Sequence, residues 1–196
     1  MKEIEELISS WPTLASGLHY HWMVDYPAYS AYGTYELTAE QWANRDLIQN
    51  FKGNSELTTE QDHELAMQQA IALVAGYITK NFGEQSKQLT LLCIPAARQA
   101  DNKRRFEEFS QNVCKITGME NAYNAIHYDK EIDEDGETVD RYCLDTTQLQ
   151  GKNILLFDDI IASGGSVTRF ADAIKDICHV VGALALGKKI SDGYDK

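Results

Sequence analysis

The 196-residue sequence is poor in cysteine and in positive charge. Its four cysteines, Cys93, Cys114, Cys143 and Cys178, are widely spaced and form no Cys-x-x-Cys pair, which argues against a zinc site. We expect reduced thiols in or near the core of a cytoplasmic protein. Lys and Arg number 18 against 30 Asp and Glu, and the net charge is −12. A large nucleic-acid surface needs a basic face, so we expect no nucleic-acid partner.

Long apolar runs are also missing. No run reaches the ~18 residues that a membrane-spanning helix needs, and the acidic stretch 1–8 lacks the apolar core of a signal peptide. We therefore expect no membrane partner. The chain does have 43% apolar and 24% charged residues, which is typical of a soluble globular protein. Its length suits one domain, and no repeat or linker divides it, so we predict a single domain over residues 1–196.

The most informative stretch is 153–166. Residues 154–157 form a short apolar run, which predicts a strand buried on both faces of a parallel sheet. Asp158 and Asp159 follow at the carboxyl end of this strand, where ligands bind in open α/β sheets. The small residues 162–166 then precede a helical pattern, so their backbone N–H groups can approach an anion. This order predicts a phosphate-binding loop beside two acids for ribose hydroxyls or Mg²⁺. The alternative is an ordinary strand–helix turn with solvated acids.

Residues 154–166 resemble the phosphoribosyl pyrophosphate (PRPP) signature of type I phosphoribosyltransferases: four apolar residues, two acids, two apolar residues and a small-residue loop. The resemblance implies an α/β fold, with a Rossmann-like core whose central, mostly parallel sheet is flanked by helices. It makes Asp158 and Asp159 the catalytic pair, binding the ribose hydroxyls and, through PRPP, Mg²⁺. The 5-phosphate would be bound by the loop residues Ala162, Ser163, Gly164, Gly165 and Ser166. The family's 6-oxopurine enzymes carry an aspartate in place of Ala162, which counts against a hypoxanthine–guanine type of acceptor.

A second site is expected after another apolar run, residues 89–94. In the resembling family the loop after the first core strand binds pyrophosphate, which implies this role for Ala96, Ala97 and Arg98. The segment 98–105 holds the one local basic cluster of this acidic chain, and guanidinium groups suit a diphosphate. The alternative is a solvated flank at the start of a helix.

Two strand-like segments, 125–128 and 138–144, surround an acidic tip in which Asp135-Gly136 is a strong turn signal. They predict a hairpin. In the resembling family a mobile loop at this place closes over the substrate, so we expect Lys130 and Arg141 to reach the diphosphate. Such a lid would keep water away from an activated ribosyl centre.

The resemblance divides the chain into a variable, hood-like N-terminal α+β region (1–60) and a core (61–190). The long helix before residue 83 and the arginines after Pro95 give a partial similarity to the competence-protein-F-like branch of the superfamily. The branch usually continues with Arg-Gly-Phe-Asn-Gln, where this chain has Arg-Phe-Glu-Glu-Phe at 105–109.

The N-terminal region offers three local signals. Apolar and polar residues alternate over 18–26, which predicts a strand. Capping-box sequences begin at Thr38 and Thr58 and predict two helices. The first of these helices is expected to bury Trp42, and Gly76 in the second to mark close packing against a neighbour.

The resemblance implies an enzyme, a glycosyltransferase of the pentosyltransferase class. It would bind Mg²⁺-PRPP, a small-molecule phosphoribosyl substrate, and transfer the phosphoribosyl group to a nitrogenous acceptor with release of pyrophosphate. The alternative is a non-catalytic module of the same fold that senses PRPP or a nucleotide. A homodimer is compatible with either function, since many relatives are dimers.

Overall fold

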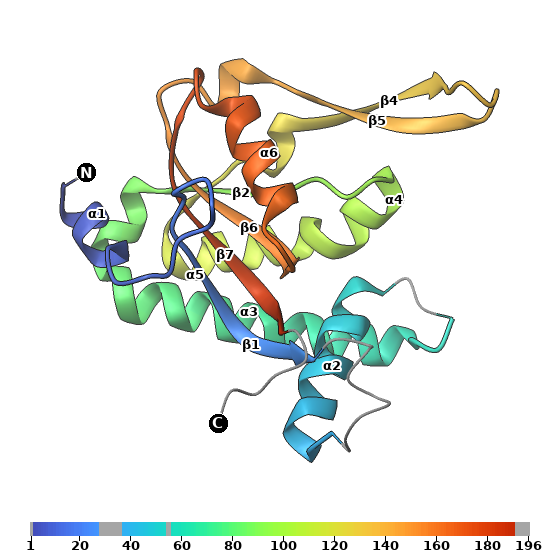
Figure 1. Cartoon of the computed structure of the whole chain (residues 1–196), viewed down its shortest axis with the longest axis horizontal. Helices are drawn as coiled ribbons and strands as arrows, with labels where there is room; N and C mark the ends of the chain where they lie inside the picture. Colours follow the sequence, from blue (N-terminus) through green and yellow to red (C-terminus); the bar gives the residue numbers. More distant parts are fainter. Residues whose placement is uncertain (1, 28–36, 54–55, 191–196) are drawn as a thin grey trace.

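The computed structural model of the chain describes residues 2–27, 37–53 and 56–190 (Figure 1). The helical segments are α1 (Lys2–Ile8), α2 (Ala39–Lys52), α3 (Glu60–Phe82), η2 (Gly83–Gln88), α4 (Gln99–Asn102), η3 (Lys103–Glu107), α5 (Glu108–Thr117), η4 (Tyr123–Ala125), η5 (Thr146–Gln148) and α6 (Gly165–Ile174). The strands are β1 (Tyr20–Pro27), β2 (Thr90–Cys93), β3 (Glu120–Asn121), β4 (Ile126–Ile132), β5 (Thr138–Leu144), β6 (Asn153–Ile161) and β7 (His179–Ile190).

Five strands form one sheet in the order β1-β7-β6-β2-β3, and every neighbouring pair is parallel. The expected α/β fold with a central parallel sheet is thus confirmed. β6 lies between β7 and β2, so the apolar run 154–157 is fully buried on both faces of the sheet. Helices α3 and α5 lie on one side of this sheet and α6 on the other (Figure 1).

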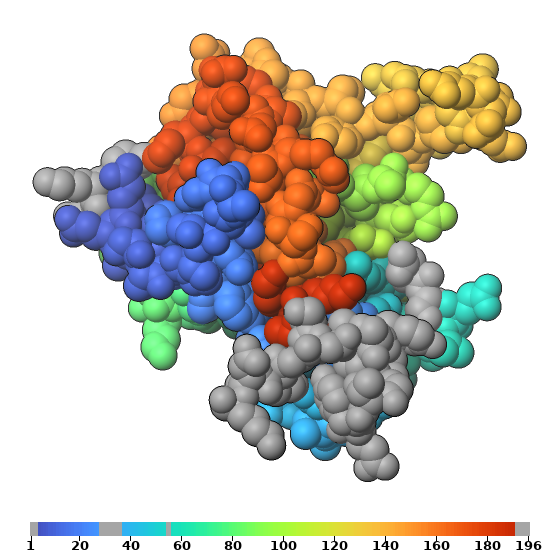
Figure 2. All heavy atoms as spheres, viewed as in Figure 1, coloured from blue at the N-terminus to red at the C-terminus, as the bar shows by residue number. Residues whose placement is uncertain are grey.

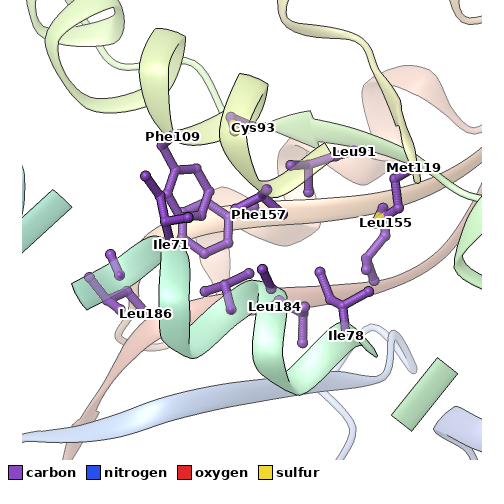
Figure 3. Packing of buried hydrophobic residues seen from close by; sticks show 14 of the residues in the cluster. Ile71, Ile78, Leu91, Cys93, Phe109, Met119, Leu155, Phe157, Leu184 and Leu186 are labelled. Atoms are coloured by element: carbon purple, nitrogen blue, oxygen red, sulfur yellow. The ribbon is translucent and has the colours of Figure 1, made fainter. Parts of the chain in front are cut away.

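Phe157 is at the centre of the larger of two apolar clusters, on the side of α2, α3 and α5 (Figure 3). Its ring stacks on Phe109 with 4.2 Å between centroids. The rings of Phe51 and Phe106 meet it edge-on at 6.4 and 6.2 Å. These contacts join three regions that are far apart in the sequence, α2, β6 and the consecutive segments η3 and α5, into one packed layer.

The N-terminal residues contribute to the main sheet rather than only covering it. β1 pairs with β7 along its length and forms one edge of the sheet. The capping box at Thr38 is present, and Gly53 ends α2 in the left-handed conformation with φ of 63°. Residues 28–36, which belong to the expected hood, lie outside the described residues.

Three local expectations for these helices are wrong. Thr59, not Thr58, caps α3, because its hydroxyl accepts the N–H of Asp62 and the helix begins one residue later. Trp42 is 47% exposed because α2 turns Leu47, Ile48 and Phe51 toward the sheet. A side chain at Gly76 would meet nothing within 4 Å, so this glycine marks no close approach.

The expected hairpin is confirmed as the antiparallel pair β4–β5, with Gly136 at φ of 82° in its turn. It projects away from the rest of the molecule (Figures 1 and 2). Among the described residues no helix is both long and apolar enough to cross a membrane.

The ring cluster predicts the effect of a substitution in β6. Phe157→Leu removes the stacked and edge-on ring contacts but keeps an apolar side chain, so we expect a loss of about 1–2 kcal/mol in the free energy of unfolding. Ile132→Ala, at a 77% exposed position, is the control and should change stability by less than about 0.5 kcal/mol. Urea denaturation followed by circular dichroism measures both. Equal effects would contradict a central role for Phe157.

Candidate functional site

The two loops singled out from the sequence follow neighbouring strands of the sheet. Cys93, at the end of β2, pairs with Phe157 of β6, and the next N–H, of Ile94, donates to the carbonyl oxygen of Phe157 at 2.8 Å. Asp158 is therefore placed where the chain leaves β2. β6 itself does not end at Phe157, as the sequence suggested, but continues to Ile161 by pairing with β7. The two acids lie within the strand, beyond the end of its neighbour.

A pocket of about 200 Å³ opens over the 162–166 loop. It is lined by Asp158, Ile160, Ile161, Ala162, Ser163, Gly164, Gly165, Ser166 and Val167. The structure thus brings Asp158 together with all five loop residues expected to bind a phosphate. α6 starts at Gly165, so the N-terminus of this ten-residue helix is at the pocket. Unpaired N–H groups and the helix dipole favour an anion there.

Gly164 has a specific structural reason to be glycine. Its φ is 82°, in the left-handed region that side chains disfavour. A Cβ at this position would also lie 2.5 Å from Cδ2 of Leu14, which packs against the loop. Its carbonyl oxygen accepts the N–H of Thr168 and so begins the hydrogen bonding of α6. The loop conformation is therefore fixed both by backbone geometry and by contact with the N-terminal segment.

Asp158 faces this pocket and has an unusual protonation equilibrium. Its Oδ1 accepts the N–H of Asp159 at 2.8 Å. Burial, together with the charge of Asp159, raises the pKa of Asp158 to about 7. Removal of a carboxylate from water disfavours its charged form, and a second acid nearby has the same effect. Near neutral pH Asp158 therefore exists in both forms, and a cation or a pair of hydroxyl donors would favour the charged one.

Asp159 does not line the pocket. Successive strand residues point to opposite faces, so Asp159 lies on the same side of the sheet as Phe157. It is only 4% exposed and forms ion pairs with Lys52 Nζ at 3.2 Å and Arg105 Nη1 at 3.0 Å. Arg105 Nε also donates to the carbonyl oxygen of Lys52, at the end of α2. This buried group connects α2, β6 and the helical turn η3.

Sequence reasoning assigned no role to Lys52 and counted Arg105 only as part of the basic cluster 98–105, not as a partner of Asp159. For Arg105 a signal was available: it precedes Phe109 by four residues, so both lie on the buried face of one helix, and a buried cation needs an anion. Lys52 carries no such signal, because its position depends on how α2 docks on the sheet.

The expected pyrophosphate residues lie in the 95–99 segment, which already has internal partners. The N–H of Ala96 donates to Oδ1 of the buried Asn102 at 3.1 Å. The carbonyl oxygen of Ala96 accepts the hydroxyl of Tyr128 at 2.6 Å. Burial raises the pKa of Tyr128, so this hydroxyl stays protonated and remains a donor. Arg98 is exposed and forms a two-pronged ion pair with Asp101. Ala97 lies between Ala96 and Arg98, both of which have protein partners.

The two basic residues expected to reach the diphosphate are paired within the hairpin. Lys130 Nζ donates to Asp140 at 2.5 Å, and Arg141 pairs with Glu131 at 3.0 Å. The cross-strand register puts Lys130 opposite Asp140, whereas Arg141 lies on the other face of the hairpin. Neither residue lines the pocket over the 162–166 loop.

Lys188 is a further residue at the site that sequence reasoning missed. It pairs with Ile161 in the β6–β7 register, and its ammonium group donates to the carbonyl oxygen of Ala162. It also lies 5.6 Å from the centroid of the Tyr20 ring. Partial burial lowers the pKa of Lys188. It is a cation in contact with the start of the 162–166 loop.

The residues present can take part in holding Mg²⁺ but do not surround it. Among the described residues there is no group of three or more His, Cys, Asp or Glu side chains that could hold a metal ion. Asp158 provides one carboxylate at the pocket. Mg²⁺ prefers oxygen ligands and is often bound chiefly through substrate phosphates. The donor set therefore fits a magnesium ion carried by a ligand.

No protein-family model and no curated protein matches the sequence. The chain is similar to PRPP synthetase from Mycobacterium smegmatis, with 17% identity over 63% of this chain and 34% of that chain and a TM-score of 0.40. It is also similar to adenine phosphoribosyltransferase from Thermoanaerobacter pseudethanolicus, with 14% identity over 64% of this chain and 81% of that chain and a TM-score of 0.39. A third similar structure is a hypothetical protein from Neisseria gonorrhoeae with bound ppGpp, with 16% identity over 70% of this chain and 73% of that chain and a TM-score of 0.38. The match thus spans about a third of the synthetase. At these identities and TM-scores the three structures are similar to parts of this chain only, and neither its family nor its activity follows from them.

The ion pairs of Asp159 predict a large effect of its substitution on stability. Asp159→Asn removes a buried charge and leaves Lys52 and Arg105 without their anion, so we expect a loss of roughly 2–4 kcal/mol in the free energy of unfolding. The control is Glu60→Gln, which breaks an ion pair with Arg104 in which Glu60 is 83% exposed. It should cost much less than Asp159→Asn, because solvent screens an exposed ion pair. Denaturant titration measures both, and an Asp159→Asn protein as stable as the wild type would rule out this structural role.

Proposed function

We propose that the pocket formed by Asp158 and the 162–166 loop binds the phosphorylated ribose of PRPP. We further propose that the chain transfers the phosphoribosyl group to a nitrogenous acceptor. The observation that supports this most is the convergence of three features on one pocket: a loop with a left-handed glycine, the N-terminus of α6, and a partly protonated carboxylate. Together they suit a phosphate joined to a hydroxyl-bearing group.

Each part of the pocket has a role in the proposal. Backbone N–H groups of the loop and the dipole of α6 hold the 5-phosphate, with the hydroxyls of Ser163 and Ser166 as further donors. Asp158 accepts hydrogen bonds from the ribose hydroxyls, which favour its charged form. Asp159 would have to leave Lys52 and Arg105 to reach the sugar. The proposal therefore rests on Asp158 and the loop.

The reaction needs positioning and charge stabilisation more than a protein nucleophile. The lone pair of the acceptor nitrogen forms a bond to the anomeric carbon, the bond from that carbon to pyrophosphate breaks, and pyrophosphate leaves with the electron pair. The acceptor then loses a proton to solvent. In the proposal, Arg98 of the segment that follows the neighbouring strand β2 stabilises the charge that develops on the leaving group. Mg²⁺ carried by the diphosphate would neutralise part of the same charge.

One observation favours the second candidate, a binding module without catalysis. Within the 95–99 segment, the N–H of Ala96 and the guanidinium of Arg98 already have protein partners. A protein that holds a sugar phosphate but expels no pyrophosphate would not need these groups. The two candidates differ in one measurement, the release of pyrophosphate from Mg²⁺-PRPP with a panel of purine, pyrimidine and amide acceptors. Release with any acceptor that stops in Asp158→Asn supports the enzyme. Binding of PRPP without release by any acceptor supports the module.

Asp158→Asn tests the pocket itself through binding. The asparagine keeps the shape but not the charge of the side chain, so ribose 5-phosphate should bind at least about tenfold more weakly. Isothermal titration calorimetry measures this, with Asp129→Asn on the hairpin as a control for the loss of one charge. Unchanged affinity in Asp158→Asn would remove the pocket assignment.

Asp158→Asn, which should weaken binding, is expected to stabilise the fold, and this gain depends on pH. An unfolded aspartate has a pKa of about 4, whereas Asp158 has a folded-state pKa of about 7. Between these values the folded protein holds a proton that the unfolded chain releases, so the stability of the wild type falls as the pH rises. Asp158→Asn removes this loss. Its melting temperature should equal that of the wild type near about pH 4 and exceed it by a few degrees near about pH 8. A constant difference across this range would contradict the raised pKa.

A further inference from the structure

A carboxylate of the hairpin occupies the start of α4, directly beside the 95–99 segment. Oδ2 of Asp140 accepts the backbone N–H of Gln99 at 2.7 Å. Oδ1 of the same residue accepts the ammonium of Lys130 at 2.5 Å. The side chain of Asp140 is only 10% exposed although most of the hairpin faces solvent. Both of its oxygens are therefore engaged by cationic or N–H donors.

The donors around the Asp140 carboxylate are of the kind that bind an anion. The pKa of Asp140 lies below its usual value because of the hydrogen bond from Lys130 first and that from Gln99 second, with a further contribution from the charge of Arg98. Gln99 directly follows the residues expected to bind pyrophosphate. A diphosphate at this segment would seek the same three groups: an N–H, an ammonium and a guanidinium.

The rest of the hairpin fixes Asp140 in this place. Tyr128, on the same face as Lys130 and Asp140, binds the carbonyl oxygen of Ala96. Tyr142 is the cross-strand partner of Tyr128, and its ring lies 6.1 Å from that of Phe170 in α6. One face of the hairpin thus touches both the 95–99 segment and the helix that follows the 162–166 loop. An isolated two-stranded hairpin is marginally stable, so these contacts contribute much of its stability.

We propose that Asp140 is an internal anion that competes with a diphosphate for the 95–99 segment, so that the β4–β5 hairpin restrains binding there. The proposal rests on the proposed function in one respect, that a diphosphate binds at this segment. A diphosphate that takes the N–H of Gln99 must displace the carboxylate, because two anions cannot share these donors without strong repulsion. Displacement also frees Lys130 for the incoming ligand.

The competition predicts that removal of the carboxylate strengthens binding. We expect Asp140→Asn and Asp140→Ala to bind Mg²⁺-pyrophosphate about three- to tenfold more tightly than the wild type, since the hydrogen bond from Gln99 to a charged carboxylate no longer has to be broken. The measurement is calorimetric titration with pyrophosphate. Asp140→Asn keeps an oxygen that can accept the N–H of Gln99, so this variant should preserve the local structure. Asp140→Ala removes the contact fully.

The control is Asp129→Asn, which removes the same charge from the opposite face of the same hairpin, where Asp129 contacts Cys143. It should leave the affinity for pyrophosphate within about twofold of the wild type. An equal gain in Asp129→Asn would show a general charge effect and overturn the proposal. So would equal or weaker binding in both Asp140 variants.

A parallel titration with ribose 5-phosphate separates this proposal from the proposed function. If ribose 5-phosphate binds but pyrophosphate binds to neither the wild type nor the variants, the competition is refuted while the pocket of Asp158 stands. If neither ligand binds to any of these proteins, both proposals fail. Binding of pyrophosphate only after Asp140 is replaced would be the strongest support for an internal competitor.

Discussion

The ion pairs that Asp159 forms with Lys52 and Arg105 are the interaction on which the arrangement of the site depends. They neutralise a buried carboxylate, and they hold the end of α2 and the π-helical turn η3 against β6. They also place the two adjacent acids in different surroundings. Asp159 is committed to the helical layer around Phe157, while Asp158 faces the pocket over the 162–166 loop. The charge of Asp159 still acts on its neighbour and helps to raise the pKa of Asp158.

The site is thus made of one preformed part and one restrained part. Gly164, Leu14 and the start of α6 fix the 162–166 loop in a conformation that presents its backbone to an anion. The 95–99 segment is instead occupied by protein groups, with Asp140 bound at Gln99. Under the proposed function, a sugar phosphate would enter the first part without rearrangement, whereas a diphosphate would have to displace a carboxylate in the second. The hairpin contacts the 95–99 segment through Tyr128 and the helix after the loop through Tyr142, so it would couple the two parts.

The features that the sequence predicted well depend on local patterns. The apolar run of β6, the capping box that begins α2 and the turn of the hairpin each follow from a few neighbouring residues. The 162–166 loop was also recognisable, because a run of small residues between a strand and a helix is typical of an anion-binding turn. The partners of Asp159 and Asp140 were not predictable in this way. They lie on other elements, and which face of α2 is buried, with Trp42 outside it, depends on docking against the sheet.

The central claim, that the 162–166 loop and Asp158 bind a phosphorylated ribose, is tested most directly by backbone amide NMR during titration with ribose 5-phosphate. The amide signals of residues 158 and 162–166 should shift in a saturable way, and those of the hairpin tip should stay in place. A well-folded protein whose loop signals do not move, or whose shifts lie elsewhere in the chain, would contradict the account.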